Sequence, residues 1–253
     1  MILAIDIGNT NIVFGVANEN EWVKIWRIQT DWSKTADEYE VIFRSLFDSS
    51  SISYNDISRA VLSSVVPSLI RAFREMLNNL LESSLLLVEP SIYDNLPIKI
   101  IDPYEIGTDL VADATAAFIG YGGSTMVIDF GTALTFTTIS RQGEILGVAI
   151  TPGLLTALKS LTRNTAQLRD VQLSAPPSVL GKNTVHAIQS GIVLGFSGLV
   201  DSMVSRTEAE LGEKLTVVAT GGLSSVLKNV SARIEIIDEN LTLDGLKYIA
   251  QYV

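Results

Sequence analysis

The sequence lacks the side chains on which many metal and redox sites depend. Its 253 residues include no cysteine and one histidine, His186. A disulfide, a thiolate nucleophile and a multi-histidine metal centre are therefore excluded. The two common glycine-rich phosphate motifs are also absent: no G-x-x-x-x-G-K-[ST] occurs, and no G-x-G-x-x-G follows a strand. The first absence excludes a P-loop, and the second argues against a Rossmann dinucleotide site.

Positive charge is also scarce, with 18 Lys and Arg against 28 Asp and Glu and a net charge of −10. No basic cluster offsets this charge, so we expect no nucleic-acid partner. No apolar run reaches the ~18 residues of a membrane span, and no basic leader precedes the first apolar run. We therefore expect a cytoplasmic chain with no membrane contact. A hydrophobic content of 47% is ample for packed cores.

One short phrase occurs twice in the chain. Residues 2–10 read ILAIDIGNT, and residues 126–133 read MVIDFGTA. Each is a β-branched run ending in Asp, a spacer, Gly and a small polar residue, and apolar residues follow, so each predicts a strand, a turn and a strand. The Gly lets backbone N–H groups approach an anion, and the Asp can hold a metal ion or its waters. Two such hairpins suggest a nucleotide phosphate tail gripped from both sides.

Strands alternate with helical patterns throughout, which predicts an α/β fold in two halves, residues 1–115 and 116–253. Thr35 is expected to cap the helix that follows it, and Ser68 to cap the helix after Pro67. A helix from Asp109 to about residue 121 is expected to hold the hinge. Residues 183–204 predict a helix with a glycine-rich face that allows close helix packing.

Two further motifs each have a structural and a functional reading. Thr220, Gly221 and Gly222 follow an apolar strand, where they form either a tight packing turn or a bare backbone surface for adenine. Asp109 follows Gly107 and Thr108 at a helix start, where it is either a cap or the general base of a phosphoryl transfer.

Taken together, these motifs resemble the type III pantothenate kinases of the acetate kinase/Hsp70/actin-like superfamily. The resemblance covers nearly the whole chain and also includes the segments VVP at 65–67, PG at 152–153 and ENLTLDGL at 239–246. It implies two ribonuclease H-like (actin-like ATPase) half-domains with a nucleotide cleft between them. It also implies ATP-dependent phosphorylation of pantothenate, the first step toward coenzyme A, by a homodimer that uses Mg²⁺ and a monovalent cation, K⁺ or NH₄⁺.

The resemblance further implies roles for individual residues. Asp109 would be the catalytic proton acceptor, and Asp6 and Asp129 would lie at metal ions, Asp129 at the monovalent one. The residues expected to bind ATP are Asp6, Ile7, Gly8, Asn9, Thr10, Asn11, Ile12, Val13, Gly131, Thr132, Gly221 and Gly222. Those expected to bind pantothenate are Ile100, Gly107, Thr108, Asp109, Leu110 and Thr184.

Three positions depart from the family pattern. Leu110 stands where Arg is usual, Ile100 stands where Tyr is usual, and residues 165–169 read TAQLR in place of TAKLP. These departures fall on the pantothenate side, so two alternatives stay open. One is a non-catalytic homologue with a binding or regulatory role, and the other is a kinase for a different small hydroxylated substrate.

Overall fold

A computed structural model describes residues 1–19, 21–163 and 171–253, in two compact units. Unit 1 comprises residues 1–116 and 241–253, and unit 2 comprises residues 117–240. The division after residue 116 falls within helix α3 (Thr108–Tyr121). Residues 241–253, which the sequence-based division assigned to the second half, belong instead to unit 1. Residues 165–169 lie outside the described residues.

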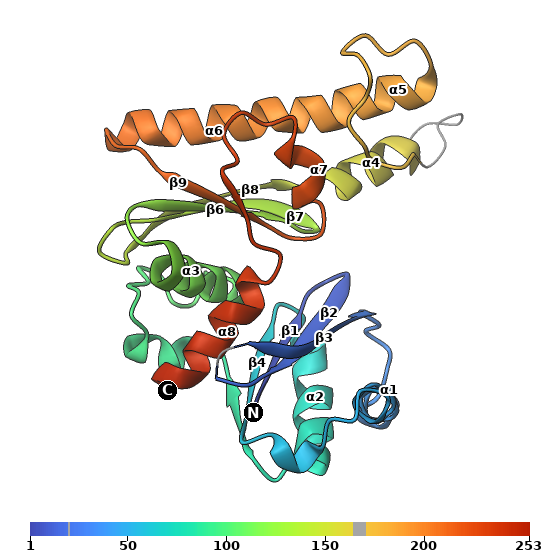
Figure 1. Cartoon of the computed structure of the whole chain (residues 1–253), viewed down its shortest axis with the longest axis vertical. Helices are drawn as coiled ribbons and strands as arrows, with labels where there is room; N and C mark the ends of the chain where they lie inside the picture. The colour runs from blue at the N-terminus through green and yellow to red at the C-terminus, as the bar shows by residue number, and fades with distance from the viewer. Residues whose placement is uncertain (20, 164–170) are drawn as a thin grey trace. The chain divides into compact units, whose positions relative to one another are not determined.

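Unit 1 is built on a five-stranded sheet in the order β3-β2-β1-β4-β5 (Figure 1). Its strands are β1 (Ile2–Ile7), β2 (Asn11–Ala17), β3 (Trp22–Gln29), β4 (Arg59–Ser64) and β5 (Ser84–Leu87). The first three strands pair antiparallel, and β4 and β5 extend the sheet in parallel with β1. The expected strand–turn–strand at residues 2–16 is therefore confirmed.

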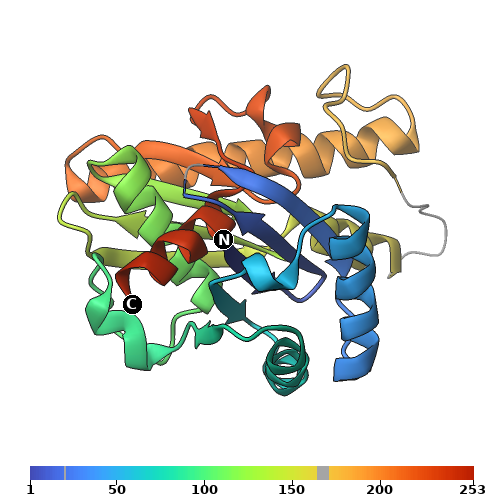
Figure 2. The ribbon, with the colours of Figure 1, turned by 60° about the horizontal axis from the view of Figure 1, so that its bottom comes forward.

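Helices cover both faces of this sheet. They are α1 (Ala36–Ser49), α2 (Pro67–Leu80), the first part of α3 and α8 (Leu241–Tyr252), with the short helices η1 (Tyr54–Asp56) and η2 (Pro90–Asn95). Leu3, Ile5 and Ile7 alternate along β1 and join the core that α1 and α2 complete. Helix α8 packs on β1 and β4, and Figures 1 and 2 show it on the side of the sheet opposite α1 and α2.

The two helix starts predicted from the sequence have different outcomes. Thr35 caps α1 as expected, in a capping box: its hydroxyl oxygen accepts the Glu38 N–H, and its own N–H donates to the Glu38 carboxylate. The prediction for Ser68 is wrong, because α2 begins at Pro67 and its cap is Val66, two residues before Ser68. Proline suits a first helical position because its fixed φ is already helical and its missing N–H has no partner there.

Unit 2 repeats the topology of unit 1 in a sheet of order β10-β9-β6-β7-β8. Its strands are β6 (Thr125–Phe130), β7 (Ala133–Ile139), β8 (Ile145–Pro152), β9 (Thr216–Thr220) and β10 (Ile236–Ile237). The antiparallel run β6-β7-β8 and the parallel pairs β6-β9 and β9-β10 match those of the first sheet. The phrase that occurs twice in the sequence thus forms the first hairpin of each unit.

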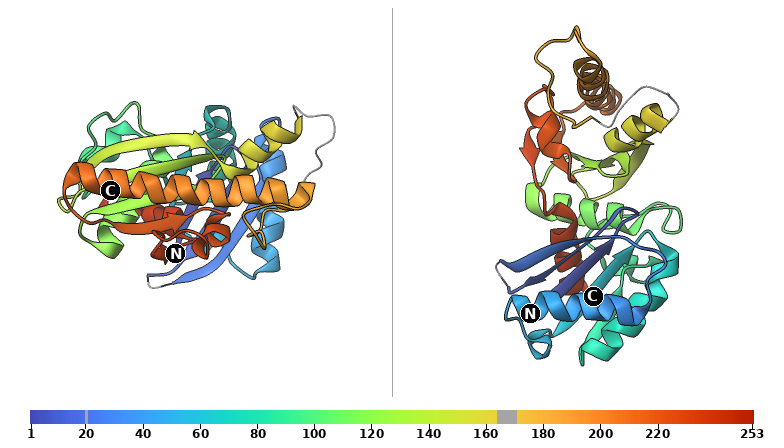
Figure 3. Two further views of the ribbon diagram at one scale, coloured as in Figure 1. Left: turned by 90° about the horizontal axis from the view of Figure 1, so that it is seen from above. Right: turned by 90° about the vertical axis from the view of Figure 1, so that its right-hand side faces the viewer.

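The helices of unit 2 include a long, almost continuous one. They are α4 (Leu154–Arg163), α5 (Thr184–Gln189), the π-helical turn η3 (Ser190–Leu194), α6 (Gly195–Leu211) and α7 (Ser224–Lys228). Figure 3 shows α5, η3 and α6 running in one line beside the sheet. The segment Thr184–Leu211 is long and apolar enough to cross a membrane by length and composition only, and core helices of soluble proteins meet the same criterion.

Candidate functional site

The turn between β1 and β2 is held open as a backbone cradle. The Gly8 N–H donates to the Asn11 carbonyl at 3.0 Å, and a Cβ added at Gly8 would lie 3.0 Å from that same oxygen. Thr30, just after β3, donates its hydroxyl to the Gly8 carbonyl at 2.7 Å and its N–H to the Thr10 carbonyl. Asn9 and Thr10 are exposed at the tip. The turn therefore has the braced, accessible form of an anion-binding loop.

Not every residue expected to bind ATP in this hairpin can do so through its side chain. Ile7 and Ile12 are fully buried in the core of unit 1, where they pack with the strands and α1 and α2. Any contact they make with a ligand must come from their backbone. Asp6, by contrast, is half-buried at the end of β1, where a carboxylate can face a ligand.

Asp6 is linked to the start of α3 through a serine that the sequence did not single out. Ser63 donates its hydroxyl to Oδ1 of Asp6 at 3.1 Å, and its oxygen lies 2.9 Å from the Thr108 hydroxyl. The parallel pairing of β1 with β4 places Ser63 directly beside Asp6. The strand register thus joins Asp6, Ser63 and Thr108 in one hydrogen-bonded row.

Asp109 lies in the first turn of α3, where its side chain bends back to the neighbouring backbone. Its Oδ1 accepts the Leu110 N–H at 2.8 Å. A Cβ added at Gly107 would collide with the same Oδ1, so glycine is required there for this side-chain position. Burial raises the pKa of the Asp109 carboxyl above its usual 3.8. The partial positive charge at the N-terminus of α3 favours the deprotonated carboxylate, which is the form that acts as a base.

The two residues that depart from the family pattern are placed differently. Leu110 is only 7% exposed and packs in unit 1, whereas Ile100 is half-buried in the segment that leads to α3. Neither side chain carries a hydrogen-bond donor.

The second hairpin gathers the corresponding residues of unit 2. A Cβ added at Gly221 would collide with Oδ1 of Asp129, and Gly221 has a φ of +85°, a conformation that favours glycine. Thr132 is exposed, and its carbonyl accepts the Gly153 N–H at 3.0 Å and the Thr156 hydroxyl. The strand end that carries Asp129 therefore meets the bare backbone after β9, and Gly222 is exposed beside it.

Thr184 begins α5, away from the second hairpin in sequence. It lines a cavity of about 530 Å³ together with Leu161, Gly181, Asn183 and Ile192. Asn183 caps the helix by accepting the His186 N–H at 2.9 Å. His186 is half-buried near the start of α5.

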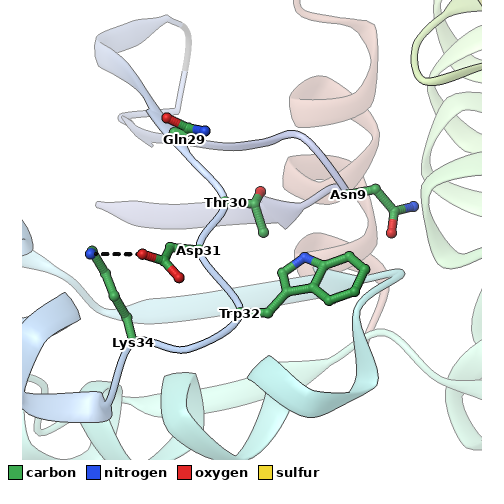
Figure 4. A pocket seen from close by; sticks show the side chains of 6 residues that line it. All are labelled: Asn9, Gln29, Thr30, Asp31, Trp32 and Lys34. Atoms are coloured by element: carbon green, nitrogen blue, oxygen red, sulfur yellow. Dashed lines mark hydrogen bonds and ion pairs between the residues drawn. The ribbon is translucent and has the colours of Figure 1, made fainter. Parts of the chain in front are cut away.

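A second cavity, of about 450 Å³, lies beside the first hairpin and is shown in Figure 4. Its lining residues are Asn9, Gln29, Thr30, Asp31, Trp32 and Lys34. The Trp32 ring points toward Asn9, whereas Asp31 pairs with Lys34 at 3.0 Å on the other side of the loop. The hydrogen bonds from Ser33, and after them this ion pair, lower the pKa of Asp31 to about 2.

Within the described residues, no three Asp, Glu or His side chains gather as a metal cluster. A site that holds a divalent ion by one carboxylate fits Mg²⁺, which keeps several waters and takes other oxygens from phosphates.

Two units with one repeated topology, each with an Asp–Gly hairpin, define the actin-like ATPase fold. Solved structures of that fold match nearly the full chain. MreB 5 of Spiroplasma citri bound to AMPPNP aligns with a TM-score of 0.58 at 11% identity, over 99% of this chain and 96% of that one. The polyphosphate/ATP-glucomannokinase of an Arthrobacter species aligns with a TM-score of 0.52 at 16% identity, over 100% and 99%.

Sequence comparison is more specific. The sequence model of the type III pantothenate kinase family matches residues 2–206. The type III pantothenate kinase of Citrifermentans bemidjiense is 41% identical over 251 residues, 99% of each chain. That of Moorella thermoacetica is 42% identical over 249 residues, 98% of each. The chain therefore belongs to the type III pantothenate kinase family.

Proposed function

We propose that this chain transfers the γ-phosphoryl group of ATP to pantothenate, giving 4′-phosphopantothenate, the first step toward coenzyme A. Membership of the family at about 40% identity over the full chain supports the reaction. The observation that carries the proposal is Asp109, whose half-buried carboxylate is fixed at a helix N-terminus by a backbone N–H.

The reaction needs a base and a held phosphate tail more than it needs covalent chemistry. Asp109 accepts the proton of the pantothenate 4′-hydroxyl as that oxygen bonds to the γ-phosphorus. The bond from the γ-phosphorus to the β–γ bridging oxygen breaks, and ADP leaves. A backbone N–H already fixes Oδ1 of Asp109, and within the described residues no side chain donates to this carboxylate. The carboxylate can therefore accept the substrate hydroxyl.

We assign the phosphate tail to the backbone of residues 6–13, which presents N–H groups at the exposed tip. Thr132 contacts ATP, and Gly131, Gly221 and Gly222 provide close-approach backbone for the nucleotide. Asp6 would hold Mg²⁺ together with the phosphates, and the ion would supply positive charge to neutralise the transferring group. Asp129 would hold the monovalent cation, K⁺ or NH₄⁺.

We assign pantothenate binding to Gly107, Thr108 and Thr184. Ile100 and Leu110 form an apolar wall of this binding site. Gly107 and Thr108 flank Asp109, and Thr184 lines the cavity at the start of α5. Because the proposed reaction consumes ATP, we also propose that the protein acts in the cytoplasm.

We further propose that the chain works as a homodimer whose interface lies on unit 2. A Cβ added at Gly191, Gly195 or Gly198 meets nothing within 4 Å, so this glycine face of the long helix is open to a second helix. The edge strand β8 also exposes apolar side chains, with Val148 39% and Ile150 69% exposed. Open edges and apolar patches of this kind are typical of subunit contacts.

The test is ATP turnover coupled to ADP detection, with and without pantothenate and with K⁺, NH₄⁺ or Na⁺. Turnover that depends on pantothenate supports the proposal. ATP turnover with another hydroxylated acceptor but not with pantothenate would support the altered-substrate reading, which the apolar Leu110 favours. Binding of ATP without any turnover would support a non-catalytic homologue.

A further inference from the structure

One buried tyrosine has a hydroxyl that the folded chain leaves without a partner. Tyr93 lies in η2 and is 4% exposed. Among the described residues, nothing is within hydrogen-bond distance of its phenolic oxygen. A buried hydroxyl without a partner destabilises the folded state, so such groups in native proteins call for a functional explanation.

The charges that act on Tyr93 come from the proposed active site. Burial is the main cause that raises the pKa of Tyr93 to about 12, and the carboxylates of Asp109 and then Glu89 raise it further. Glu89 already accepts the Ser91 hydroxyl at 2.9 Å. The phenol therefore keeps its proton at working pH, and Asp109 is the stronger of the two negative groups that it faces.

The Asp109 carboxylate can accept further hydrogen bonds. Its Oδ1 takes the Leu110 N–H, and within the described residues no side chain donates to its carboxylate. The Tyr93 hydroxyl, a donor shielded from water, and the Asp109 carboxylate, an acceptor, thus lie in the same unit. The charge of Asp109 acts on the pKa of Tyr93. Catalytic hydrogen bonds are often long in a free enzyme and tighten when substrate binds.

We propose that Tyr93 is a positioning residue for Asp109, whose carboxylate receives the Tyr93 O–H when the substrate is bound. This inference rests on the proposed function. The hydrogen bond holds the base in one rotamer and favours its charged form. A substrate atom is the less suitable partner, because the phenolic oxygen is shielded from solvent.

The experiment compares Tyr93→Phe with Tyr54→Phe in the full chain. Tyr54 is a matched control, because its hydroxyl is also buried without a partner among the described residues and its pKa is also raised to about 12, by burial and by Asp48. Removing a hydroxyl that bonds nothing in the free protein should leave both melting temperatures unchanged or slightly higher.

Tyr93→Phe is expected to lower kcat roughly ten- to a hundredfold, the contribution of one hydrogen bond to a charged group, with KM for ATP unchanged. The acid limb of its kcat–pH profile should move up by about one pH unit, because the carboxylate loses a donor. Tyr54→Phe should change neither quantity.

Wild-type turnover with an unchanged kcat and pH profile in Tyr93→Phe would overturn this inference alone. An equal loss in Tyr54→Phe would overturn it as well, since any buried phenol would then have the same effect. A wild type that does not phosphorylate pantothenate would overturn the proposed function, and the inference with it.

Discussion

At the residue scale, the environment of Asp109 separates a catalytic base from a helix cap. Asp109→Asn keeps the shape of the side chain, and its amide oxygen can still accept the Leu110 N–H. We expect the melting temperature and ATP binding to be nearly unchanged and the rate to fall ~100- to 10,000-fold, because an amide cannot accept the hydroxyl proton. Single-turnover phosphorylation measures the rate. A variant that keeps more than about a tenth of it would show that Asp109 is only a cap.

The same carboxyl gives a pH prediction. Burial raises the pKa of Asp109 above 3.8, and the base acts only when deprotonated. We therefore expect kcat to fall as the pH drops through an apparent pKa above that of an ordinary aspartate. The kcat–pH profile checks this, and a flat profile down to pH 4 would contradict it.

Leu110 tests recognition of the substrate carboxylate. Leu110→Arg adds a donor that can pair with it, so KM for pantothenate should fall roughly tenfold or more. The melting temperature should also fall, because Leu110 is buried. Leu110→Met controls for chain length and should change neither value greatly.

The double variant Leu110→Arg/Ile100→Tyr extends the comparison. If the native chain already binds pantothenate as tightly as the double variant does, the carboxylate is held by other groups, such as backbone N–H groups near Gly107.

Sequence reasoning at this scale found residues inside contiguous motifs and missed those placed by the fold. Asp109 follows glycine at a helix start, a pattern visible in three letters. Ser63 reaches Asp6 only through the register of two strands far apart in sequence. Tyr93 comes from a six-residue 3₁₀ helix, which is too short to give a periodic signal.

At the element scale, a helix start can be predicted to the residue where the local sequence favours one cap. Thr35 could be predicted because its capping box with Glu38 lies within four residues. The start of α2 could not be placed to the residue, because proline and serine both suit the first turn. Such ambiguities shift a boundary without altering the fold.

The C-terminal end of α6 gives an element-scale prediction about stability. Glu208 pairs with Arg233 at 2.6 Å and with Lys214 at 2.9 Å, and the hydrogen bonds from Arg233 and then Lys214 lower its pKa from 4.5 to about 2. Since the folded pKa lies below the unfolded one, this stabilisation is complete above about pH 5 and is lost as the pH falls toward 2.

We therefore expect Glu208→Gln to lower stability by about 1–3 kcal/mol at pH 7, since it leaves Arg233 without its charged partner. The loss should shrink at pH 4 and below. Thermal unfolding at several pH values measures it. Glu210→Gln, two residues along the same helix and exposed, is the control. Equal effects of the two substitutions, or an effect that does not vary with pH, would contradict the linkage.

At the scale of the whole molecule, the repeated phrase predicted the repeated topology because hairpin signals are local. The return of α8 to unit 1 was not predictable from such signals. Gly245 packs so closely on Ala112 that a Cβ there would collide with the Ala112 carbonyl, and Trp22 donates to Asp244 at 3.0 Å. These contacts join residues more than a hundred positions apart, which periodicity does not reveal.

The proposed homodimer interface on β8 can be tested by a single substitution. If β8 lies in a homodimer interface, Ile150→Glu places a charge against the partner subunit and should shift the protein from dimer to monomer at micromolar concentration. Sedimentation velocity measures the change. Val41→Glu is the matched control, because Val41 on α1 is 68% exposed against 69% for Ile150 and should leave the dimer intact. A monomeric wild type would contradict the homodimer. A dimeric Ile150→Glu would place the interface elsewhere on the chain.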